Sequence, residues 1–386
     1  MKVVITGISG QDGYFLSQLL LSKGYEVHGI LRRNSSMTQG TIDSLPPRIR
    51  KQLVIHYGDI TDENFLSKLL QGEKPDELYH LAAQSFVGYS FENAQSTYDV
   101  NIGGTLNVCN AIRSSSLDTR MYFAATSELF GKPAESPQNE KTPLLPRSPY
   151  AVSKLAGLWT TRTYRDAYQL FMSNGILFNH ESEVRGPEFV TRKISMGVAN
   201  IFHGSDEPIV LGNLSAVKDW GYAKDYVEGM WRMLQYEVPD DFVMGTGESH
   251  TVRDFVEEAF GAVGIKITWK GTGVNEVGLS DEGKVLVKTS RGLYRPFWYF
   301  TNGHSKEKSL TISSVLSFPS IDTITSHFNL FALTNPVISS RTFPILFSSL
   351  NAGMIIVVDG IKLSVSSTVC IIPFNINQLY LLFTLY

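Results

Sequence analysis

Two pairs of polar residues near the middle of the chain have the types and spacing needed for proton transfer. Tyr150 and Lys154 are four residues apart, so on a helix their side chains would share one face. A lysine ammonium close to a phenol favours the phenolate. We therefore expect Lys154 to lower the pKa of Tyr150 from its ordinary value of about 10. The phenolate could then accept a proton from a substrate hydroxyl near neutral pH.

Thr126 and Glu128 form the second pair, directly after an apolar strand pattern over 121–125. Ligands of open α/β sheets bind at this carboxyl end of the strands. The Thr126 hydroxyl could hydrogen-bond the oxygen that Tyr150 deprotonates. A simple oxidoreductase or epimerase needs no further group. The carboxylate of Glu128 therefore indicates an elimination, in which it takes the acidic proton beside a new ketone and then protonates a departing hydroxyl.

Each pair also has a simpler explanation. Tyrosine and lysine at this spacing often share a solvated helix face by chance, and Glu128 could be an ordinary loop charge after a strand. Some decarboxylases also carry a carboxylate at the equivalent place. The surrounding elements favour the chemical interpretation.

A glycine-rich turn near the N-terminus indicates a dinucleotide site. The segment 6–13, TGISGQDG, lies between a strand pattern over 2–6 and a helical pattern that ends near Gly24. Gly7 permits the tight turn, Gly10 lets the backbone approach a pyrophosphate, and Gly13 lets the helix pack close to the strand. The helix N-terminus offers free N–H groups to the anion.

The residues after the second strand pattern, 26–31, indicate which dinucleotide binds. An NAD site usually has an acidic residue here for the ribose 2′-hydroxyl. This chain instead has the segment 32–36, RRNSS, and its arginines suit a 2′-phosphate. We therefore predict NADP. The alternative is that Arg32 and Arg33 are ordinary exposed loop charges.

Two further polar residues follow the next strand patterns, 53–57 and 77–81. Asp59 could meet the adenine amine of the cofactor, or it or Thr61 could cap a helix over 62–70. His80 lies within a strand pattern, which is typical of a hydrogen-bonded core histidine.

Strand and helix patterns alternate over residues 1–180, with a long helix near 94–115 and a sixth strand over 170–178. The predicted fold class is α/β, a doubly wound parallel sheet. Residues 181–296 are predicted to form a smaller, interleaved α/β part that mainly binds substrate, with helices near 192–203, 226–236 and 252–263. Scattered cations could converge there on a diphosphate, although each alone is typical of a surface charge: Arg192, Lys193, Lys218, Arg253 and Arg295.

The composition excludes several other classes. The 386 residues are 43% hydrophobic and 18% charged, enough to bury a sizeable core. A net charge of −3 provides no basic field for nucleic acid and no polybasic membrane patch. Cys109 and Cys370 predict neither a disulfide framework nor a zinc site, and we expect no bound metal. The N-terminus lacks a signal-peptide pattern, so a cytoplasmic location is expected.

The segment 297–386 differs from the rest of the chain. It contains seven charged residues, is rich in Ser, Thr, Phe, Ile and Leu, and has no sustained helical or strand period. We interpret it as translation outside the gene's own reading frame, without a native fold. A membrane anchor is the alternative, since 363–386 carries no charge and is long enough to span. Pro373, Asn375 and Asn377 interrupt that stretch.

Residues 1–296 resemble the GDP-mannose 4,6-dehydratase family of the extended short-chain dehydrogenase/reductase superfamily, which has a Rossmann-type fold. The resemblance is carried by TGISGQDG at 6–13, RRNSS at 32–36, LAAQS at 81–85, TSELFG at 126–131, RSPYAVSK at 147–154, GILFNHES at 175–182, FVTRKI at 189–194, LGNL at 211–214 and DWGY at 219–222. It implies dehydration of GDP-mannose by oxidation at C4, loss of water across C5–C6 and return of hydride to C6.

The resemblance also implies roles for individual residues. The catalytic residues would be Thr126, Glu128 and Tyr150, with Lys154 in support. NADP would be bound by Gly7, Gly10, Gln11, Asp12, Gly13, Arg32, Asn34, Ser35, Asp59, Ile60, Leu81, Ala82, Ala83, Gln84, Ser85, Lys154, His180 and Arg185. GDP-mannose would be bound by Ser85, Glu128, Tyr150, Asn179, Lys193, Gly212, Lys218, Arg253 and Arg295. Family members are homodimers or homotetramers, in which the loop around 32–36 reaches a neighbouring subunit.

The chain departs from the family pattern at several positions. The family usually has Pro-Arg in place of Glu183-Val184, an arginine in place of Lys218, and often a tyrosine near Ser96. Lysine keeps the charge but loses the bidentate fork, so diphosphate binding would be weaker. Two alternatives remain: another nucleotide-sugar epimerase or dehydratase of this fold, and a catalytically impaired homologue that binds both ligands.

Overall fold

The computed structural model describes residues 1–33, 39–115, 118–133 and 135–293, together with the backbone of five strands between residues 342 and 375. The chain divides into two compact units, Met1–Phe328 and Asn329–Tyr386. Asn34, Ser35 and Arg295, for which the sequence predicts ligand contacts, lie outside the described residues.

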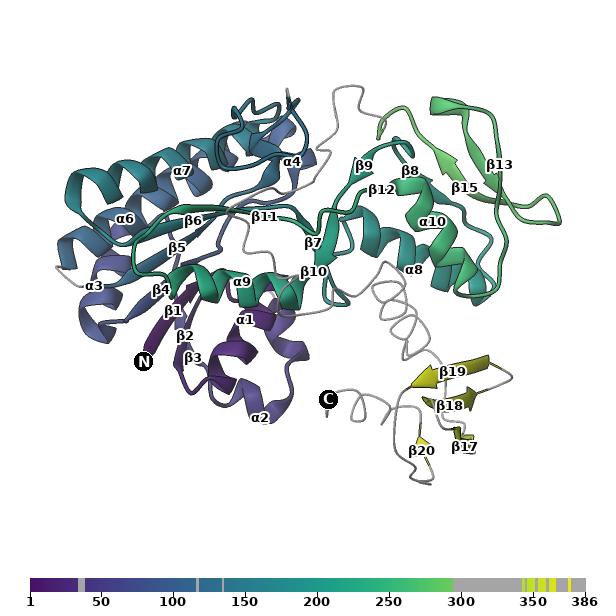
Figure 1. The fold of residues 1–386 in the computed structure, drawn as a ribbon, viewed down its shortest axis with the longest axis horizontal. Coiled ribbons are helices and arrows are strands. Elements are labelled where there is room, and N and C mark those ends of the chain that lie inside the picture. The colour runs from purple at the N-terminus through teal and green to yellow at the C-terminus, as the bar shows by residue number, and fades with distance from the viewer. Residues whose placement is uncertain are drawn as a thin grey trace. The chain divides into compact units, whose positions relative to one another are not determined.

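A seven-stranded parallel sheet forms the centre of the first unit, in the order β11-β6-β5-β4-β1-β2-β3 (Figure 1). The strand order reverses between β1 and β4, which is where open α/β sheets bind their ligands. This confirms the predicted doubly wound sheet. The strands are β1 (Lys2–Thr6), β2 (Glu26–Leu31), β3 (Val54–Tyr57), β4 (Glu77–His80), β5 (Arg120–Ala124), β6 (Met172–Leu177) and β11 (Asp241–Met244).

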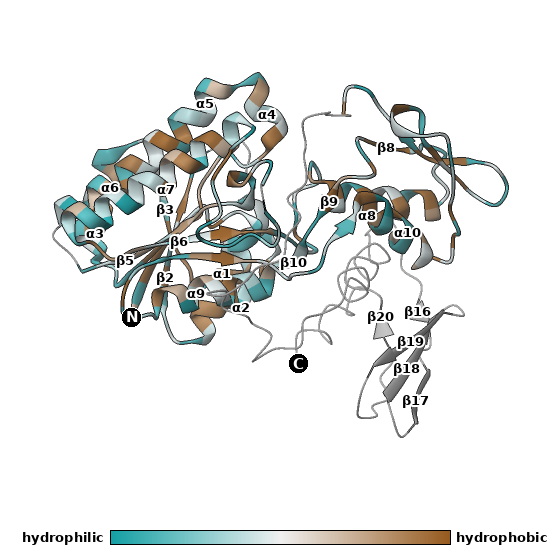
Figure 2. Cartoon of the chain, turned by 45° about the horizontal axis from the view of Figure 1, so that its top comes forward, coloured by the Kyte–Doolittle hydropathy of each residue, from teal (hydrophilic) through white to brown (hydrophobic). Residues whose placement is uncertain are grey.

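Helices cover both faces of this sheet. On one face, α3 (Glu63–Glu73), α6 (Gly104–Ser115) and α7 (Pro149–Tyr168) pack on side chains such as Val4, and on the other α1 (Gln11–Ser22) and α9 (Ala223–Leu234) pack on Val3 and Ile5. Adjacent residues of β1 thus face opposite layers, as the period of two requires. Apolar residues accordingly gather on the strands and on helix surfaces turned toward them (Figure 2).

The long helix predicted near 94–115 is present, with an irregular turn inside it. It consists of α5 (Ala94–Tyr98), a π-helical turn over Asp99–Gly103 and α6. A π turn inserts an extra residue and reorients the side chains around it, often at functional sites. Other predicted boundaries shift slightly: α3 begins after its cap Asp62, whose side chain accepts a hydrogen bond from the Phe65 N–H. Neither Asp59 nor Thr61 is therefore the cap.

The smaller part of the first unit has its own apolar core around Phe255, Phe260 and Leu286. A four-stranded sheet, β13-β14-β15-β8, packs there with α8 (Val190–Phe202) and α10 (Val252–Gly261). The strands are β8 (Ile209–Leu211), β13 (Thr268–Lys270), β14 (Val277–Leu279) and β15 (Val285–Thr289). Two short ladders complete it: β7 (Asn179–Glu181) with β10 (Trp220–Tyr222), and β9 (Val217–Lys218) with β12 (His250–Thr251).

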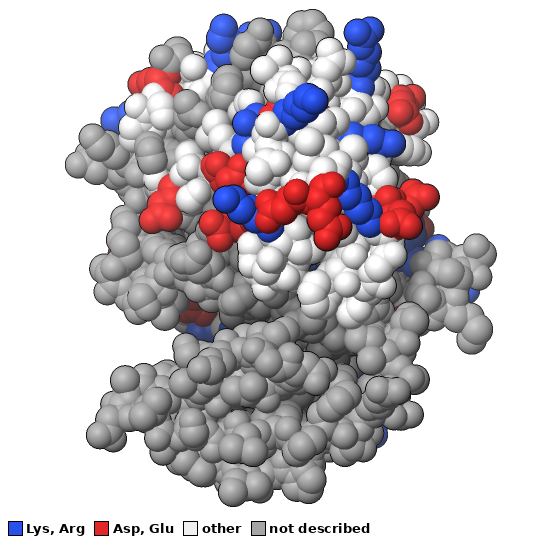
Figure 3. All heavy atoms as spheres, turned by 90° about the vertical axis from the view of Figure 1, so that its right-hand side faces the viewer, with Lys and Arg blue, Asp and Glu red and all other residues white. Residues whose placement is uncertain are grey.

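The two parts are interleaved in sequence. Helix α9 and strand β11 come after residue 180, yet both belong to the large sheet and its layers. The chain therefore enters the smaller part, returns to the large sheet, and enters the smaller part again. One face of the molecule, over the smaller part, shows acidic and basic side chains side by side and no field of one sign (Figure 3).

The second unit contains antiparallel strands where the sequence predicts no regular element. β17 (Leu346–Leu350), β18 (Gly353–Val358) and β19 (Ile361–Val365) form a meander, and β16 (Thr342–Phe343) pairs with β20 (Phe374–Asn375). In the described part of the chain, no helix is both long and apolar enough to cross a membrane.

Candidate active site

A cavity of about 970 Å³ opens at the carboxyl ends of β1, β4 and β5, between the large sheet and the smaller part. Of the residues to which the family resemblance assigns a catalytic or ligand contact, and which the structure describes, every one except Arg253 lines it. Arg33 and Arg192, which the sequence pattern alone suggested as phosphate partners, do not line it. Arg253 instead forms an ion pair with Glu276, with Nη2 and Oε1 2.5 Å apart. The cavity therefore brings together segments that lie as far apart in the sequence as Gly7 and Leu293.

The three glycines of the first turn are required for different reasons. Gly7 has a φ of +73°, and a Cβ there would lie 2.7 Å from the Ala82 nitrogen. At Gly13 a Cβ would lie 2.4 Å from the Ile8 oxygen, so α1 could not pack against the turn. At Gly10 the nearest protein atom would be 3.4 Å away, although Gly10 lines the cavity. Gly10 thus leaves room for something other than protein, as a dinucleotide cradle requires.

Alanine substitutions should distinguish a glycine needed for packing from a glycine that leaves space for the cofactor. Gly13→Ala is expected to lower the thermal unfolding midpoint or prevent folding, because its Cβ overlaps backbone atoms. Gly10→Ala should leave the midpoint nearly unchanged while weakening cofactor affinity about tenfold or more, because its Cβ enters the space left for the phosphates. Thermal unfolding with and without cofactor, together with calorimetric titration, would measure both. Equal loss of stability in both variants would contradict the assignment of Gly10.

Tyr150 and Lys154 lie in the first turns of α7, whose start is fixed by a cap. The Ser148 hydroxyl accepts a hydrogen bond from the Ala151 N–H at 3.1 Å, and Pro149 occupies the first turn, where its missing N–H costs nothing. Both Tyr150 and Lys154 are buried and both line the cavity. The predicted shared helix face is therefore present.

The expected lowering of the Tyr150 pKa by Lys154 is wrong. Burial raises the pKa of Tyr150 and the Glu128 carboxylate raises it further, while a hydrogen bond with Thr126 lowers it only in part. The Lys154 ammonium instead donates to the Ala124 carbonyl at 2.8 Å. Burial lowers the pKa of Lys154 to about 8, although Asp12 opposes this. Helical spacing places Tyr150 and Lys154 on one face, but it does not determine which acceptor the Lys154 ammonium binds.

Thr126 and Glu128 occupy the bend after β5, as predicted. Thr126 caps the 3₁₀ turn Ser127–Leu129, where its hydroxyl accepts a hydrogen bond from the Glu128 N–H at 3.2 Å. The Glu128 carboxylate forms an ion pair with Lys218 of β9, with Oε1 and Nζ 3.2 Å apart. Glu128 is thus held between the large sheet and the smaller part.

His180 and Asp12 form a partly buried pair beside the glycine turn. His180 Nε2 lies 3.0 Å from both carboxylate oxygens of Asp12, and its ring stacks on Tyr226 with centroids 4.4 Å apart. Burial opposes both charges, but their attraction leaves the pKa of Asp12 lowered and that of His180 raised. Gln11 donates to the His180 carbonyl at 3.0 Å. These contacts tie the glycine turn to the β7 strand.

Asn101 is a positioning residue that the sequence did not single out. It lies in the π-helical turn, where its Oδ1 accepts a hydrogen bond from the Gln84 N–H at 2.8 Å and its Nδ2 donates to the Gln84 carbonyl at 3.1 Å. The same Nδ2 donates to Ser153 at 2.9 Å. Asn101 therefore fixes the 81–85 loop against the Tyr150 helix. The sequence signal for Asn101 is the presence of an amide side chain on a buried helix face.

Three other polar residues near the cavity have defined partners. His80 is buried between the hydroxyls of Thr6, at 2.8 Å, and Thr105, at 3.0 Å, which confirms its interpretation as a core histidine. Asp59 accepts hydrogen bonds from the N–H and hydroxyl of Thr61 and also lines the cavity. Arg185 forms an ion pair with Glu181 at 3.1 Å.

The fold and the cavity together define a Rossmann-type α/β protein, with a Tyr–Lys helix beside a glycine-rich turn. Several solved structures have the same fold as this chain. They include a dTDP-glucose 4,6-dehydratase from Streptomyces venezuelae bound to NAD, with a TM-score of 0.67 and 21% identity over 85% of this chain and 97% of that one. A UDP-glucose 4-epimerase from Thermus thermophilus, also bound to NAD, has a TM-score of 0.62 and 23% identity over 85% and 99%.

Sequence comparison defines the family. The family model for GDP-mannose 4,6 dehydratase matches residues 4–302. The human GDP-mannose 4,6 dehydratase is 51% identical over 76% of this chain and 81% of its own length. The Vibrio cholerae GDP-mannose 4,6-dehydratase is 48% identical over 72% and 76%. The chain belongs to the GDP-mannose 4,6-dehydratase family.

Proposed function

We propose that this protein is a lyase that dehydrates GDP-α-D-mannose to GDP-4-dehydro-6-deoxy-D-mannose. The observation that carries the proposal is the position of Glu128, a carboxylate in the same cavity as Tyr150 and Thr126 and paired with a lysine of the substrate side. An epimerase of this fold needs only the tyrosine, the lysine and a hydroxyl. The relatives at about half identity carry the same activity in their names.

The residues divide the reaction among them. Tyr150 removes the proton of the C4 hydroxyl, and Thr126, its hydrogen-bond partner, orients the same oxygen. Glu128 takes the C5 proton, which is acidic once C4 is a ketone, and delivers a proton to the departing C6 hydroxyl, so that one water leaves. A bound nicotinamide would supply reversible hydride acceptance, from C4 and back to C6. The proton that Tyr150 takes from the C4 hydroxyl balances the one that C5 receives when the hydride returns. The buried Lys154 ammonium favours the phenolate once substrate and cofactor bring the groups together.

The residues present fit a dinucleotide, and we propose NADP. The space at Gly10 and the N-terminus of α1 suit a pyrophosphate. Arg32 lines the cavity beyond β2, where a 2′-phosphate would lie and where an NAD site would carry an acidic residue. Asp59 and Ile60 line the cavity beside it.

Two neighbouring arginines allow a matched test of cofactor choice. Arg32→Ala is expected to weaken NADP binding tenfold or more and to leave NAD binding nearly unchanged. The reason is that the arginine would pair with the 2′-phosphate, which NADP has and NAD lacks. Arg33→Ala is the control, since Arg33 lies over the Tyr57 ring, 5.6 Å from its centroid, and does not line the cavity. Calorimetric titration with both cofactors measures the four affinities. Tighter binding of NAD than NADP by the unchanged protein would contradict the proposal.

Mass spectrometry of GDP-mannose incubated with the full chain and trace NADP tests the activity itself. We expect loss of one water per sugar nucleotide, with the cofactor oxidised again at the end. UDP- and dTDP-sugars serve as controls and should remain unchanged. Soluble protein that binds both ligands and forms no product would favour the impaired-homologue alternative.

We also propose that the enzyme is a cytoplasmic homodimer or homotetramer, like the family that the sequence resembles. Light scattering after size-exclusion chromatography measures the mass of the assembly, and a monomer under assay conditions would contradict this.

The segment 297–386 is proposed to lie outside the enzyme's fold. In support, the family match ends at residue 302, and the curated relatives align over about 300 residues. Sequencing the 3′ end of the transcript tests the proposal. A message that is in frame through codon 386 would count against it.

A further inference from the structure

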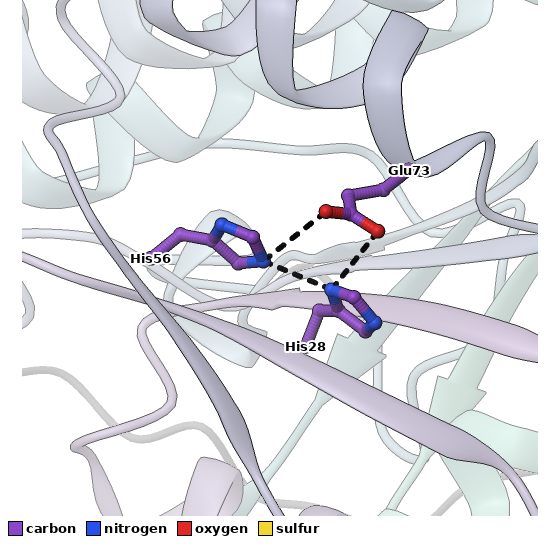
Figure 4. A group of neighbouring side chains, drawn as sticks. All are labelled: His28, His56 and Glu73. Atoms are coloured by element: carbon purple, nitrogen blue, oxygen red, sulfur yellow. Dashed lines mark hydrogen bonds and ion pairs between the residues drawn. The ribbon is translucent and has the colours of Figure 1, made fainter.

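Two histidines and a glutamate converge in the first unit, away from the cavity. His28 lies on β2, His56 on β3 and Glu73 at the end of α3, and Figure 4 shows their side chains pointing toward one another. His28 Nδ1 and His56 Nε2 are 2.9 Å apart. The oxygens of Glu73 lie 3.5 Å from the first nitrogen and 3.9 Å from the second. None of the three residues lines the cavity.

These separations match those of ligands around a small metal ion. Nitrogen and oxygen ligands at about 2.0–2.2 Å from Zn²⁺ in a tetrahedron lie about 3.3–3.6 Å from one another. The three observed distances of 2.9, 3.5 and 3.9 Å bracket that range. We propose that His28, His56 and Glu73 form a binding site for a divalent transition-metal ion of the Zn²⁺ type, with water as the fourth ligand.

A further carboxylate orients one of the ligands. Glu26 Oε1 lies 2.9 Å from His28 Nε2, so that nitrogen carries the proton and Nδ1 presents its lone pair to the cluster. A carboxylate behind a histidine ligand is the usual arrangement at zinc sites and increases the basicity of the ligand. Without an ion, the His56 N–H donates to His28 Nδ1. Moving the proton of His56 to its other ring nitrogen frees the second ligand with no net loss of a proton.

Lys2 competes with the ion for Glu73. Its Nζ lies 2.9 Å from Glu73 Oε2 and 3.6 Å from Glu26 Oε1. The Lys2 and Glu73 side chains are each 27% exposed and that of His56 is 21% exposed, so an ion and its water can enter while the lysine turns to solvent. The site is therefore weaker than one without a neighbouring ammonium, and removal of Lys2 strengthens it.

Metal titration of the tag-free full chain tests the site. The background is Cys370→Ser, which leaves the buried Cys109 as the sole cysteine. Calorimetry with Zn²⁺ and absorption spectra with Co²⁺ should show one equivalent bound with tetrahedral Co²⁺ bands and a higher thermal unfolding midpoint. His56→Gln and Glu73→Gln should each weaken Zn²⁺ affinity tenfold or more, and Glu26→Gln about tenfold. Lys2→Met should strengthen it.

Two controls distinguish this site from adventitious binding. His203→Gln removes an exposed histidine elsewhere and should leave the affinity unchanged. Cofactor binding should be unchanged in all variants, which shows that each is folded. Equal Zn²⁺ affinity in the unchanged protein, His56→Gln and Glu73→Gln would overturn the proposal, as would an affinity that falls in Lys2→Met.

Discussion

Replacing Glu128 with glutamine is expected to abolish dehydration while allowing the first oxidation. The amide keeps the size of the side chain but cannot accept the C5 proton, so product formation should fall by about 10²–10⁴-fold. Because Tyr150 and Thr126 remain, reduced nicotinamide should still form, up to one equivalent per subunit, after GDP-mannose is added. Stopped-flow absorbance measures that burst, and mass spectrometry in heavy water measures deuterium uptake at C5.

The matched control for this variant is Lys218→Met. It removes the partner of Glu128 but leaves the carboxylate, so C5 exchange should persist even if the substrate binds less tightly. Product formation by Glu128→Gln at the unchanged rate would remove the main reason for choosing a dehydratase over an epimerase.

The second large effect is expected for Tyr150→Phe, which removes only the phenolic oxygen. Without it, Tyr150 can no longer accept the C4 proton, and both the burst of reduced nicotinamide and the product should fall by about 10²–10⁴-fold. NADP affinity should remain within about twofold, since the ring keeps its packing. Stopped-flow absorbance and calorimetric titration provide the two readouts. A normal burst in Tyr150→Phe with no product would assign the proton transfer at C4 to another group.

The pH dependence of the oxidation burst should further distinguish Glu128→Gln from the unchanged protein. Burial and the Glu128 carboxylate raise the pKa of Tyr150, so the active phenolate is the minor form at neutral pH. The rate of the oxidation burst in the unchanged protein should therefore rise with pH. In Glu128→Gln the raising effect of the carboxylate is absent, so the same rise should begin at lower pH.

Local elements were predictable from short segments of sequence. The turn at Gly7, Gly10 and Gly13 and the helix that carries Tyr150 and Lys154 depend on backbone conformation and spacing within about ten residues, which a sequence displays directly. The carboxyl ends of parallel strands then bring these segments to one edge of the sheet. The cavity follows from that rule.

Hydrogen bonds and ion pairs between residues far apart in the sequence were not predictable. The Lys154 ammonium binds a carbonyl thirty residues earlier, and Glu128 pairs with a lysine ninety residues later. Such choices depend on three-dimensional distances and on the cost of burying each charge. The π turn that aims Asn101 at the 81–85 loop is a packing compromise with no pattern of its own in the sequence. Arg253 likewise forms an ion pair with Glu276, and no spacing rule relates these two residues.

The return of α9 and β11 to the large sheet has a consequence for how such enzymes can diversify. The residues of the smaller part that line the cavity come from two stretches, one before α9 and one after β11. No single contiguous segment therefore carries that half of the lining. Exchanging specificity with a relative would require two coordinated grafts, and a fragment ending at residue 180 would leave β6 as an open edge, exposed to aggregation.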